Sequence, residues 1–296
     1  MYTSINIIYN PNSTGAGKEM AQEFRAKLIE SLPKQKVTLT ATKYAGHAEK
    51  LAYDLASKTK RALIISASGD GGYHEVINGL MKAKAEGAHP IAGLLPAGNA
   101  NDHYHSLHDT EREDLVQSIV SQNERTIDLL TLSAVREGKE FVRYAHSYIG
   151  LGLTPKAGHE LNKTDLNRLN EVWIVLKVIF DLKPVKLIVN GKRRVYDSLI
   201  FSNVGKMSKI MSLSEKSELD DGKFEVAVIY RHTKFQLLRH LLKASTVGLK
   251  VNEQYSSFSF QTLRTTLIQL DGEVTRIDGE TEATISLKKK FLTCIA

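Results

Sequence analysis

The sequence predicts an α/β domain with a parallel sheet, followed by a mostly antiparallel β domain. In the first half, short apolar strand patterns alternate with amphipathic helix patterns, which is typical of βαβ units. In the second half, strand patterns follow one another, and Asn190-Gly191 predicts a hairpin with a two-residue turn. The pattern changes between residues 128 and 138, so we expect two domains rather than one.

The elements of the first half follow from their periodicity. Short apolar runs bounded by turn residues predict strands, and apolar residues spaced three or four apart predict helices. The expected strands are residues 4–9, 36–40, 62–67 and 91–95, and the expected helices are residues 19–32, 46–57 and 73–84. In a parallel sheet of this kind, ligands bind in the loops at the carboxyl ends of the strands.

The second half is read in the same way. The expected strands are residues 185–189, 193–198, 199–203, 224–230, 257–261, 266–269 and 283–287, and the expected helices are residues 166–181 and 233–247. The domain boundaries that follow are 1–128 and 129–280. Residues 281–296 form a C-terminal segment that can return to the first domain.

Composition excludes several classes of protein. The 296 residues include 40 Lys and Arg against 33 Asp and Glu, and 42% of them are hydrophobic. These values exclude a disordered or fibrous protein. The single cysteine, Cys294, excludes a disulfide framework and a cysteine-rich zinc site. No membrane-spanning or signal-peptide pattern is present, so we expect a soluble cytoplasmic protein.

Positive charge is concentrated in one part of the second half. Residues 181–250 contain 14 Lys and Arg against 7 Asp and Glu, although the whole chain carries only +7. Such a region indicates an anionic partner or, equally, a solvated surface. The amphipathic helix expected at 233–247 places Lys234, Arg239 and Lys243 where they could face an anionic membrane. A core helix with a basic outer face is the alternative, and no nucleic-acid-binding pattern is found.

Three loops carry residue types suited to phosphate. The first, Asn10 to Lys18, supplies glycines, hydroxyls and a lysine just before a helix, where backbone N–H groups and the helix dipole favour an anion. It is not a Walker A motif, because Asn12 and Glu19 stand where that motif requires Gly and Ser or Thr. A flexible turn that binds nothing is the alternative.

The second loop, Ser68 to Gly72, has three glycines in four residues, which allow the backbone to approach a ligand closely. Asp70 among them can hold Mg²⁺ or orient a hydroxyl, or it can cap the helix that follows. The third loop, Pro96 to Asp102, ends in Asn and Asp residues. These suit contacts to ribose or phosphate and equally suit a helix cap.

Taken together, these loops resemble the diacylglycerol kinase catalytic domain, a family that includes bacterial lipid kinases and the sphingosine and ceramide kinases. The matching segments, in order, are NPNSTGAGK from Asn10, Thr42 with Gly46-His47-Ala48, SGDGG-x-HEVINGL from Ser68, LPAGNAND from Leu94, Leu219 to Val226, and Leu270 to Glu273. The resemblance extends from Ile5 to Glu273 and preserves the order of the motifs.

The resemblance implies an N-terminal nucleotide-binding domain like those of 6-phosphofructokinase and NAD kinase, and a C-terminal β-sandwich that carries the lipid site. It implies transfer of the γ-phosphate of ATP to a lipid hydroxyl, with Mg²⁺. The implied nucleotide-binding residues are Asn10, Pro11, Ser13, Gly15, Thr42, Ser68, Gly69, Asp70, Gly71, Gly72, Glu75, Pro96, Gly98, Asn99 and Asn101. Glu75 would order the loop or contact ribose.

This chemistry also needs a carboxylate near the attacking hydroxyl. The implied candidates are Asp70, Asp271 and Glu273, and we expect the Asp271/Glu273 pair to act as the base, with Asp70 near the phosphates. Asp70 and Asp221 are the implied metal ligands. In an isolated sequence, Leu-Asp-Gly-Glu at 270–273 more often forms a hairpin turn.

The chain departs from the family pattern at several positions. The family's Gly-Gly-Asp-Gly-Thr begins here with Ser68 and ends with Gly72, so a phosphate-facing hydroxyl is lost and Ser68 can replace it in part. Asn99 stands where the family has Thr, and His105 where it has Arg. Asp-Gly-Glu occurs twice, at 271–273 and at 278–280, and the first is preferred because an apolar strand pattern precedes it.

We therefore expect an ATP- and Mg²⁺-dependent lipid kinase that acts as a peripheral protein at an anionic membrane surface. The alternatives are a kinase of a soluble alcohol such as NAD, and a nucleotide- or lipid-binding protein with little catalysis. Which lipid is phosphorylated is left open, as is the oligomeric state, for which a homodimer is one alternative.

Overall fold

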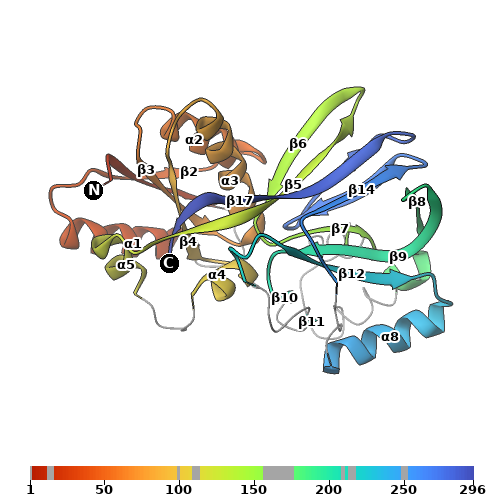
Figure 1. The fold of residues 1–296 in the computed structure, drawn as a ribbon. Helices are drawn as coiled ribbons and strands as arrows, with labels where there is room; N and C mark the ends of the chain where they lie inside the picture. Colours follow the sequence, from red (N-terminus) through yellow and green to blue (C-terminus); the bar gives the residue numbers. More distant parts are fainter. Residues whose placement is uncertain are drawn as a thin grey trace. The chain divides into compact units, whose positions relative to one another are not determined.

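The computed structural model describes residues 2–11, 17–98, 101–108, 114–155, 177–207, 211–212, 218–247 and 253–296. The chain divides into two compact units. Unit 1 contains Met1–Asp128 and Lys289–Ala296, and unit 2 contains Leu129–Lys288. Two strands, β5 (Glu124–Arg136) and β17 (Glu282–Ile295), run through the division without a break (Figure 1).

Unit 1 contains a parallel sheet, in which the strand order is β17-β4-β3-β1-β2. Its other strands are β1 (Ser4–Tyr9), β2 (Val37–Ala41), β3 (Ala62–Ser68) and β4 (Ile91–Pro96). Every residue of β3 is buried, as expected for a central strand covered on both faces. The C-terminal part of β17 joins the sheet because Thr293 and Cys294 pair with β4. The α/β prediction is confirmed for this unit.

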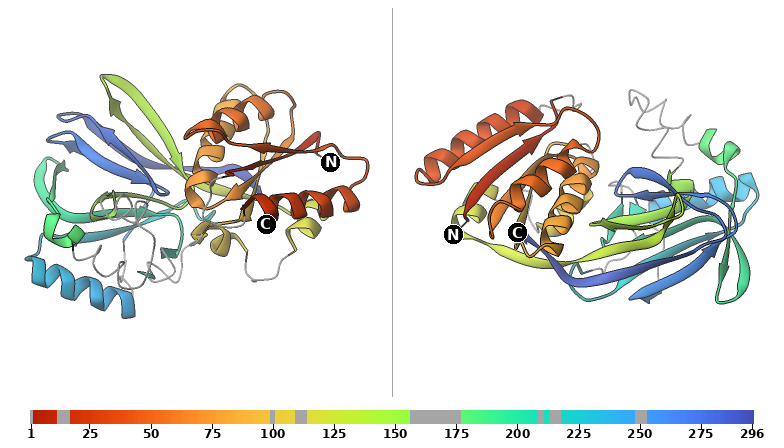
Figure 2. Two further views of the ribbon diagram at one scale, coloured as in Figure 1. Left: turned by 180° about the vertical axis from the view of Figure 1, so that it is seen from behind. Right: turned by 90° about the horizontal axis from the view of Figure 1, so that it is seen from above.

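Helices cover both faces of this sheet (Figure 2). The unit 1 helices are α1 (Gly17–Ser31), α2 (His47–Ala56), α3 (Asp70–Ala85), α4 (Asp102–Leu107) and α5 (Leu115–Ser121). Apolar residues of α1 and α5 pack in one cluster with Ile5 and Ile7, whereas α2 and α3 pack closely on each other. A Cβ on Gly79 would lie 2.2 Å from the Glu49 carbonyl oxygen, so glycine is required where α3 meets α2.

Unit 2 is built from antiparallel strands, as predicted. Besides parts of β5 and β17, its elements are β6 (Lys139–Ala145), β7 (Tyr148–Gly152), β8 (Val185–Val189), β9 (Lys192–Ser202), β10 (Lys206–Met207), β11 (Met211–Ser212), β12 (Phe224–Tyr230), α8 (Lys234–Val247), β13 (Gln254–Tyr255), β14 (Ser257–Thr262), β15 (Thr266–Leu270) and β16 (Glu273–Ile277). Alternate side chains of these strands fill an apolar core that includes Phe201, Phe224 and Phe260.

Several local expectations can be compared with this fold. The hairpin at Asn190-Gly191 is confirmed: both residues have positive φ, and Val189 pairs with Lys192. The two strands expected at 193–203 form one strand, β9. Elements from α4 to β7 were not predicted. Of the helix expected at 166–181, residues 177–181 are helical and the remainder lies outside the described residues.

Two further properties bear on earlier expectations. No helix among the residues that the structure covers is both long and apolar enough to cross a membrane. Cys294 is buried in β17, and burial raises the pKa of its thiol to about 12. The thiol is therefore protonated and unreactive at neutral pH.

Candidate functional site

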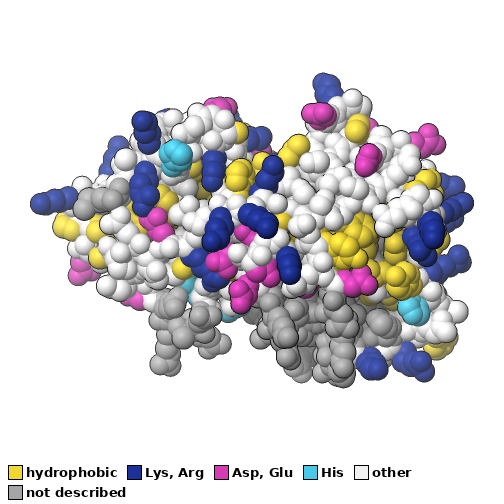
Figure 3. Space-filling view, in the orientation of Figure 1, with side chains coloured by type: hydrophobic (Ala, Val, Ile, Leu, Met, Phe, Trp, Pro, Cys, Tyr) yellow, Lys and Arg dark blue, Asp and Glu magenta, His cyan; other side chains and the backbone are white. Residues whose placement is uncertain are grey.

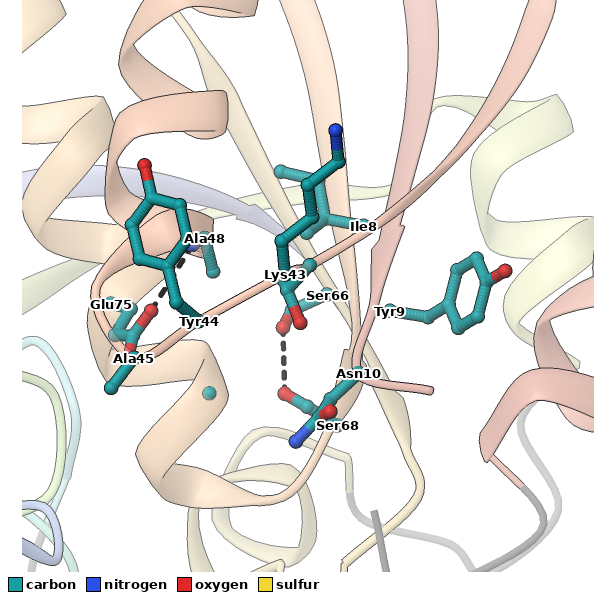
Figure 4. Close-up of a pocket in the computed structure, with 12 residues that line it drawn as sticks. Ile8, Tyr9, Asn10, Lys43, Tyr44, Ala45, Ala48, Ser66, Ser68 and Glu75 are labelled. Atoms are coloured by element: carbon teal, nitrogen blue, oxygen red, sulfur yellow. Dashed lines mark hydrogen bonds between the residues drawn. The ribbon is translucent and has the colours of Figure 1, made fainter. Parts of the chain in front are cut away.

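The candidate site lies at the carboxyl ends of β1 and β3, two neighbouring strands of unit 1 whose following connections lead in opposite directions along the sheet. β1 stands between β2 and β3; from β1 the chain goes through α1 to β2, and from β3 it goes through α3 to β4. In open α/β sheets a crevice forms between two such connections, at the carboxyl ends of the strands. A cavity of about 330 Å³ lies at this position (Figure 4).

Five of the residues predicted for nucleotide binding line this cavity: Asn10, Thr42, Ser68, Gly72 and Glu75. They come from the ends of β1, β2 and β3 and from the first turns of α3. The remaining lining residues are Ile8, Tyr9, Lys43, Tyr44, Ala45, Ala48 and Ser66. None of these seven was predicted as a site residue, although Ala48 lies in a matching segment and five others stand within two positions of a predicted residue: Ile8, Tyr9, Lys43, Tyr44 and Ser66.

Ser68 takes the space that a side chain at position 72 would need. Its hydroxyl donates to the Gly69 carbonyl oxygen at 3.0 Å and shares a 2.7 Å hydrogen bond with the Ser66 hydroxyl. A Cβ built on Gly72 would lie only 2.5 Å from Ser68 Oγ. The Ser68 side chain and any side chain at position 72 would therefore compete for one space.

Glu75 links α3 to the loop that precedes α2. Its carboxylate accepts hydrogen bonds from the backbone N–H of Gly46 at 2.9 Å and of Ala48 at 3.1 Å. Gly46 is the N-cap of α2 and provides no side-chain cap. Glu75 supplies the missing cap from another element, and its negative charge is favourable at a helix N-terminus. Of the two roles expected for Glu75, this geometry favours ordering of the loop.

We expect Glu75→Ala to lower the free energy of unfolding by about 1–2 kcal/mol, because two N–H groups at the start of α2 lose their acceptor. Urea denaturation measures this loss. Glu86→Ala is the matched control, since the Glu86 carboxylate accepts an exposed hydrogen bond from the Tyr53 hydroxyl and caps no helix N-terminus among the described residues. Equal stability of the two variants would contradict the capping role.

The second and third loops touch through their backbones. A Cβ on Gly98 would lie 2.4 Å from the Gly69 Cα, so no larger residue fits at position 98 without moving the loop. The Asn101 side chain closes the third loop, because its Oδ1 accepts from Gly98 N–H at 3.1 Å and its Nδ2 donates to the Gly98 carbonyl at 2.8 Å. The Asn101 amide oxygen and nitrogen both bond to the backbone of Gly98. These are the same groups that were expected to contact ribose.

Asp70 begins α3 and faces the start of α4. Its carboxylate oxygens lie 3.4 and 3.5 Å from the backbone nitrogens of Asp102 and His103, respectively. Both contacts are long for hydrogen bonds, and they place the Asp70 carboxylate against the first turn of α4. Among the described residues, no three His, Cys, Asp or Glu side chains gather into a metal site.

Asp271 lies in unit 2 and is buried. It forms the two-residue turn between β15 and β16 with Gly272, and both residues have positive φ. Its carboxylate accepts from the backbone N–H groups of His146 at 2.8 Å, Ser147 at 2.9 Å and Tyr148 at 3.0 Å. Asp271 thus fixes the turn that leads from β6 to β7.

The other unit 2 candidates are more exposed. Glu273 opens β16, and its carboxylate pairs with Arg143 of β6 at 3.2 Å. Asp221 accepts from the N–H of Lys223 at 2.8 Å, within the turn before β12. In the second Asp-Gly-Glu, Asp278 accepts from the N–H groups of Glu137 and Gly138, which stabilises the β5–β6 turn.

The remaining predicted residues fall into two groups. Pro11 follows β1, Gly71 lies in the first turn of α3 and Pro96 ends β4, and none of the three lines the cavity. Ser13, Gly15 and Asn99 lie outside the described residues.

Comparisons with known proteins find similarity to diacylglycerol kinases and to an acylglycerol kinase. Residues 4–132 match the family model of the diacylglycerol kinase catalytic domain. The diacylglycerol kinase of Bacillus subtilis (strain 168) is 27% identical over 264 residues, which cover 84% of this chain and 80% of that protein. The mitochondrial acylglycerol kinase of Xenopus laevis is 40% identical over 97 residues, which cover 32% of this chain and 21% of that protein.

The fold is also similar to solved structures. The crystal structure of a diacylglycerol kinase from Bacillus anthracis str. Sterne superposes with a TM-score of 0.70 at 18% identity, covering 99% of this chain and 96% of that one. The likeness therefore extends through both units, and at this identity it concerns the fold.

Proposed function

We propose that this chain, whose residues 4–132 match the family model of the diacylglycerol kinase catalytic domain, transfers the γ-phosphate of ATP to the hydroxyl of diacylglycerol or a similar lipid alcohol. One observation carries the proposal: loops within the matched residues line a cavity at the carboxyl ends of β1, β2 and β3. The neighbouring N-terminus of α3 favours an anionic ligand there.

Unit 1 is the nucleotide-binding part in this proposal. Asn10, Thr42 and the loop after β4 would line the nucleotide site, and the Gly69–Gly72 backbone would cradle the phosphates. Unit 2 would carry the lipid site. The proposal also includes two points of fold: unit 2 would be a β-sandwich, and unit 1 would resemble the nucleotide-binding domains of 6-phosphofructokinase and NAD kinase.

Phosphoryl transfer needs positioning and charge stabilisation more than covalent help from the protein. The lipid hydroxyl oxygen forms a bond to the γ-phosphorus, the bond to the β-phosphate oxygen breaks, and ADP leaves. The hydroxyl proton passes to a carboxylate of the Asp271/Glu273 pair. Because Asp271 is buried under three N–H donors while Glu273 is half-exposed, we assign proton acceptance to Glu273 and positioning to Asp271.

Mg²⁺ bound with the nucleotide would neutralise charge on the phosphates. Asp70 is the residue that would hold it in unit 1, and Asp221 is the candidate in unit 2. We expect Asp70→Asn to lower kcat/KM for ATP about 100-fold and to raise the Mg²⁺ concentration needed for half-maximal rate, because a neutral amide is a weaker ligand. Initial rates across a Mg²⁺ titration measure this, and an unchanged metal dependence would contradict the role.

The proposal itself is tested by transfer of labelled phosphate from ATP, with Mg²⁺, to lipids in mixed micelles. The panel contains diacylglycerol, monoacylglycerol, sphingosine, ceramide, phosphatidylglycerol and undecaprenol, with NAD as the soluble acceptor. We expect a labelled lipid, with diacylglycerol the foremost candidate. Labelled NADP would support a soluble-alcohol kinase, and ATP binding without any product would support a binding protein.

The same proposal includes peripheral action at the membrane, since a lipid with two acyl chains resides in the bilayer. An anionic membrane surface is the partner that the basic residues of unit 2 favour.

A further inference from the structure

Unit 2 presents large aromatic side chains to solvent on three elements that pack together. Phe235, in the first turn of α8, is 82% exposed, Phe180 in the helical turn at 177–181 is 61% exposed, and Tyr230 at the end of β12 is 60% exposed. Single exposed apolar residues need no explanation, but three aromatic rings on neighbouring elements do.

A buried apolar cluster holds together the three elements that carry these rings. Ile179, Leu182, Ile229 and Leu237 form a buried cluster that joins the 177–182 segment, β12 and α8. The Lys234 ammonium donates to the carbonyl oxygens of Ile179 and Leu182, at 2.8 Å each. Lys234 was expected on the membrane-facing side, but in the structure it fastens α8 to the neighbouring helical turn.

The spacing of exposed residues in α8 shows which face of the helix points to solvent. Phe235, Arg239 and Lys243 are exposed and follow one another at intervals of four, which places them on one face. Leu237, on another face, is 1% exposed and packs into the buried cluster. The helix therefore carries an aromatic ring and two cations along a single stripe.

The surroundings of this stripe are cationic. Residues 230–243 contain four cations and no Asp or Glu, and residues 177–186 contain three lysines against one carboxylate, Asp181. Figure 3 shows Lys and Arg side chains beside α8. We call Phe180, Tyr230, Arg231, Phe235 and Arg239 the basic aromatic surface.

We propose that the basic aromatic surface docks on anionic lipid bilayers, with the Phe180 and Phe235 rings entering the interface and the arginines facing lipid phosphates. This deepens the proposed lipid kinase function, on which it rests, by naming the surface that meets the membrane. Aromatic rings partition into the interface, and each nearby cation adds attraction to an anionic leaflet. A second copy of the chain fits less well, since a symmetric contact would bring like charges together.

The test measures sedimentation with vesicles of phosphatidylglycerol and phosphatidylcholine. We expect Phe180→Ser/Phe235→Ser to weaken binding about tenfold or more, because interfacial burial of the rings is lost. Arg231→Gln/Arg239→Gln should weaken binding about fivefold per charge at low salt and flatten its salt dependence. Val142→Ser is the matched control, because Val142 is an apolar residue of β6 that is 51% exposed.

Other outcomes overturn the inference. It fails if the Phe180/Phe235 variant binds vesicles as the wild type does, if Val142→Ser weakens binding equally, or if sedimentation velocity shows that the variant dissociates a dimer. Phosphorylation of a water-soluble short-chain diacylglycerol separates the two proposals. If wild type and the Phe180/Phe235 variant phosphorylate this soluble substrate at equal rates but bind vesicles unequally, the result supports a membrane-docking role for the basic aromatic surface. Vesicle binding that depends on the surface, without phosphorylation of any lipid, removes the kinase proposal alone.

Discussion

Asp271→Asn is expected to destabilise unit 2 by about 2–4 kcal/mol and to lower kcat by orders of magnitude. The carboxylate accepts three backbone N–H groups in a buried position, and hydrogen bonds to charged groups are the stronger ones. The amide of Asn would turn an NH₂ group toward at least one of these donors and leave it unpaired. Since Asn tolerates the left-handed backbone that Asp271 adopts, at φ 46°, the loss reports on the side chain alone.

Urea denaturation and steady-state kinetics on the same variant separate positioning from proton transfer. Asp278→Asn is the matched control, because Asp278 also accepts from two N–H groups in an Asp-Gly-Glu but in an exposed turn. Glu273→Gln should lose turnover and keep stability. An Asp271→Asn protein as stable as the wild type, yet inactive, would return the role of base to Asp271.

The second large effect concerns the loop from Ser68 to Gly72. We expect Gly72→Thr to lower kcat/KM for ATP about 100-fold, because its Cβ would lie 2.5 Å from Ser68 Oγ and one of them must move. Ser68→Gly should cost about tenfold, since one hydroxyl that can face phosphate is lost. Together, Ser68→Gly and Gly72→Thr should recover most of the wild-type value, because the hydroxyl then comes from the helical position 72.

The kinetics of all four proteins form a double-mutant cycle. Non-additivity approaching about 1000-fold is the expected result, because the two single losses would multiply to about 1000-fold if the positions did not compete for one space. Losses that simply multiply would show that Ser68 and Gly72 act separately, and melting curves of each variant exclude a general loss of fold.

The sequence was sufficient for the features that depend on neighbouring residues. Strand ends followed by glycine or polar residues predicted the loops of the site, and Asn10, Thr42 and Ser68 do line one cavity. The hairpin at Asn190-Gly191 was predictable for the same reason, because positive φ at both positions favours those two residues.

The sequence could not predict roles that depend on partners far away in the chain. The N–H groups that hold Asp271 belong to residues about 125 positions earlier, so nothing near Leu270 to Glu273 indicates that the carboxylate is buried. Glu75 caps a helix that begins 28 positions before it, and Lys234 bonds to carbonyls more than 50 positions away. In each case the side chain serves a backbone group that the tertiary fold alone brings near.

The path of β17 affects when unit 1 can complete its sheet during synthesis. Unit 1 takes its last sheet partner, at Thr293 and Cys294, from residues that follow all of unit 2. On the ribosome, β4 must therefore wait, with its edge unpaired, until more than 150 further residues have been translated. Expression of residues 1–128 alone would leave that edge permanently open, so a fragment that ends there should aggregate more readily than the full chain.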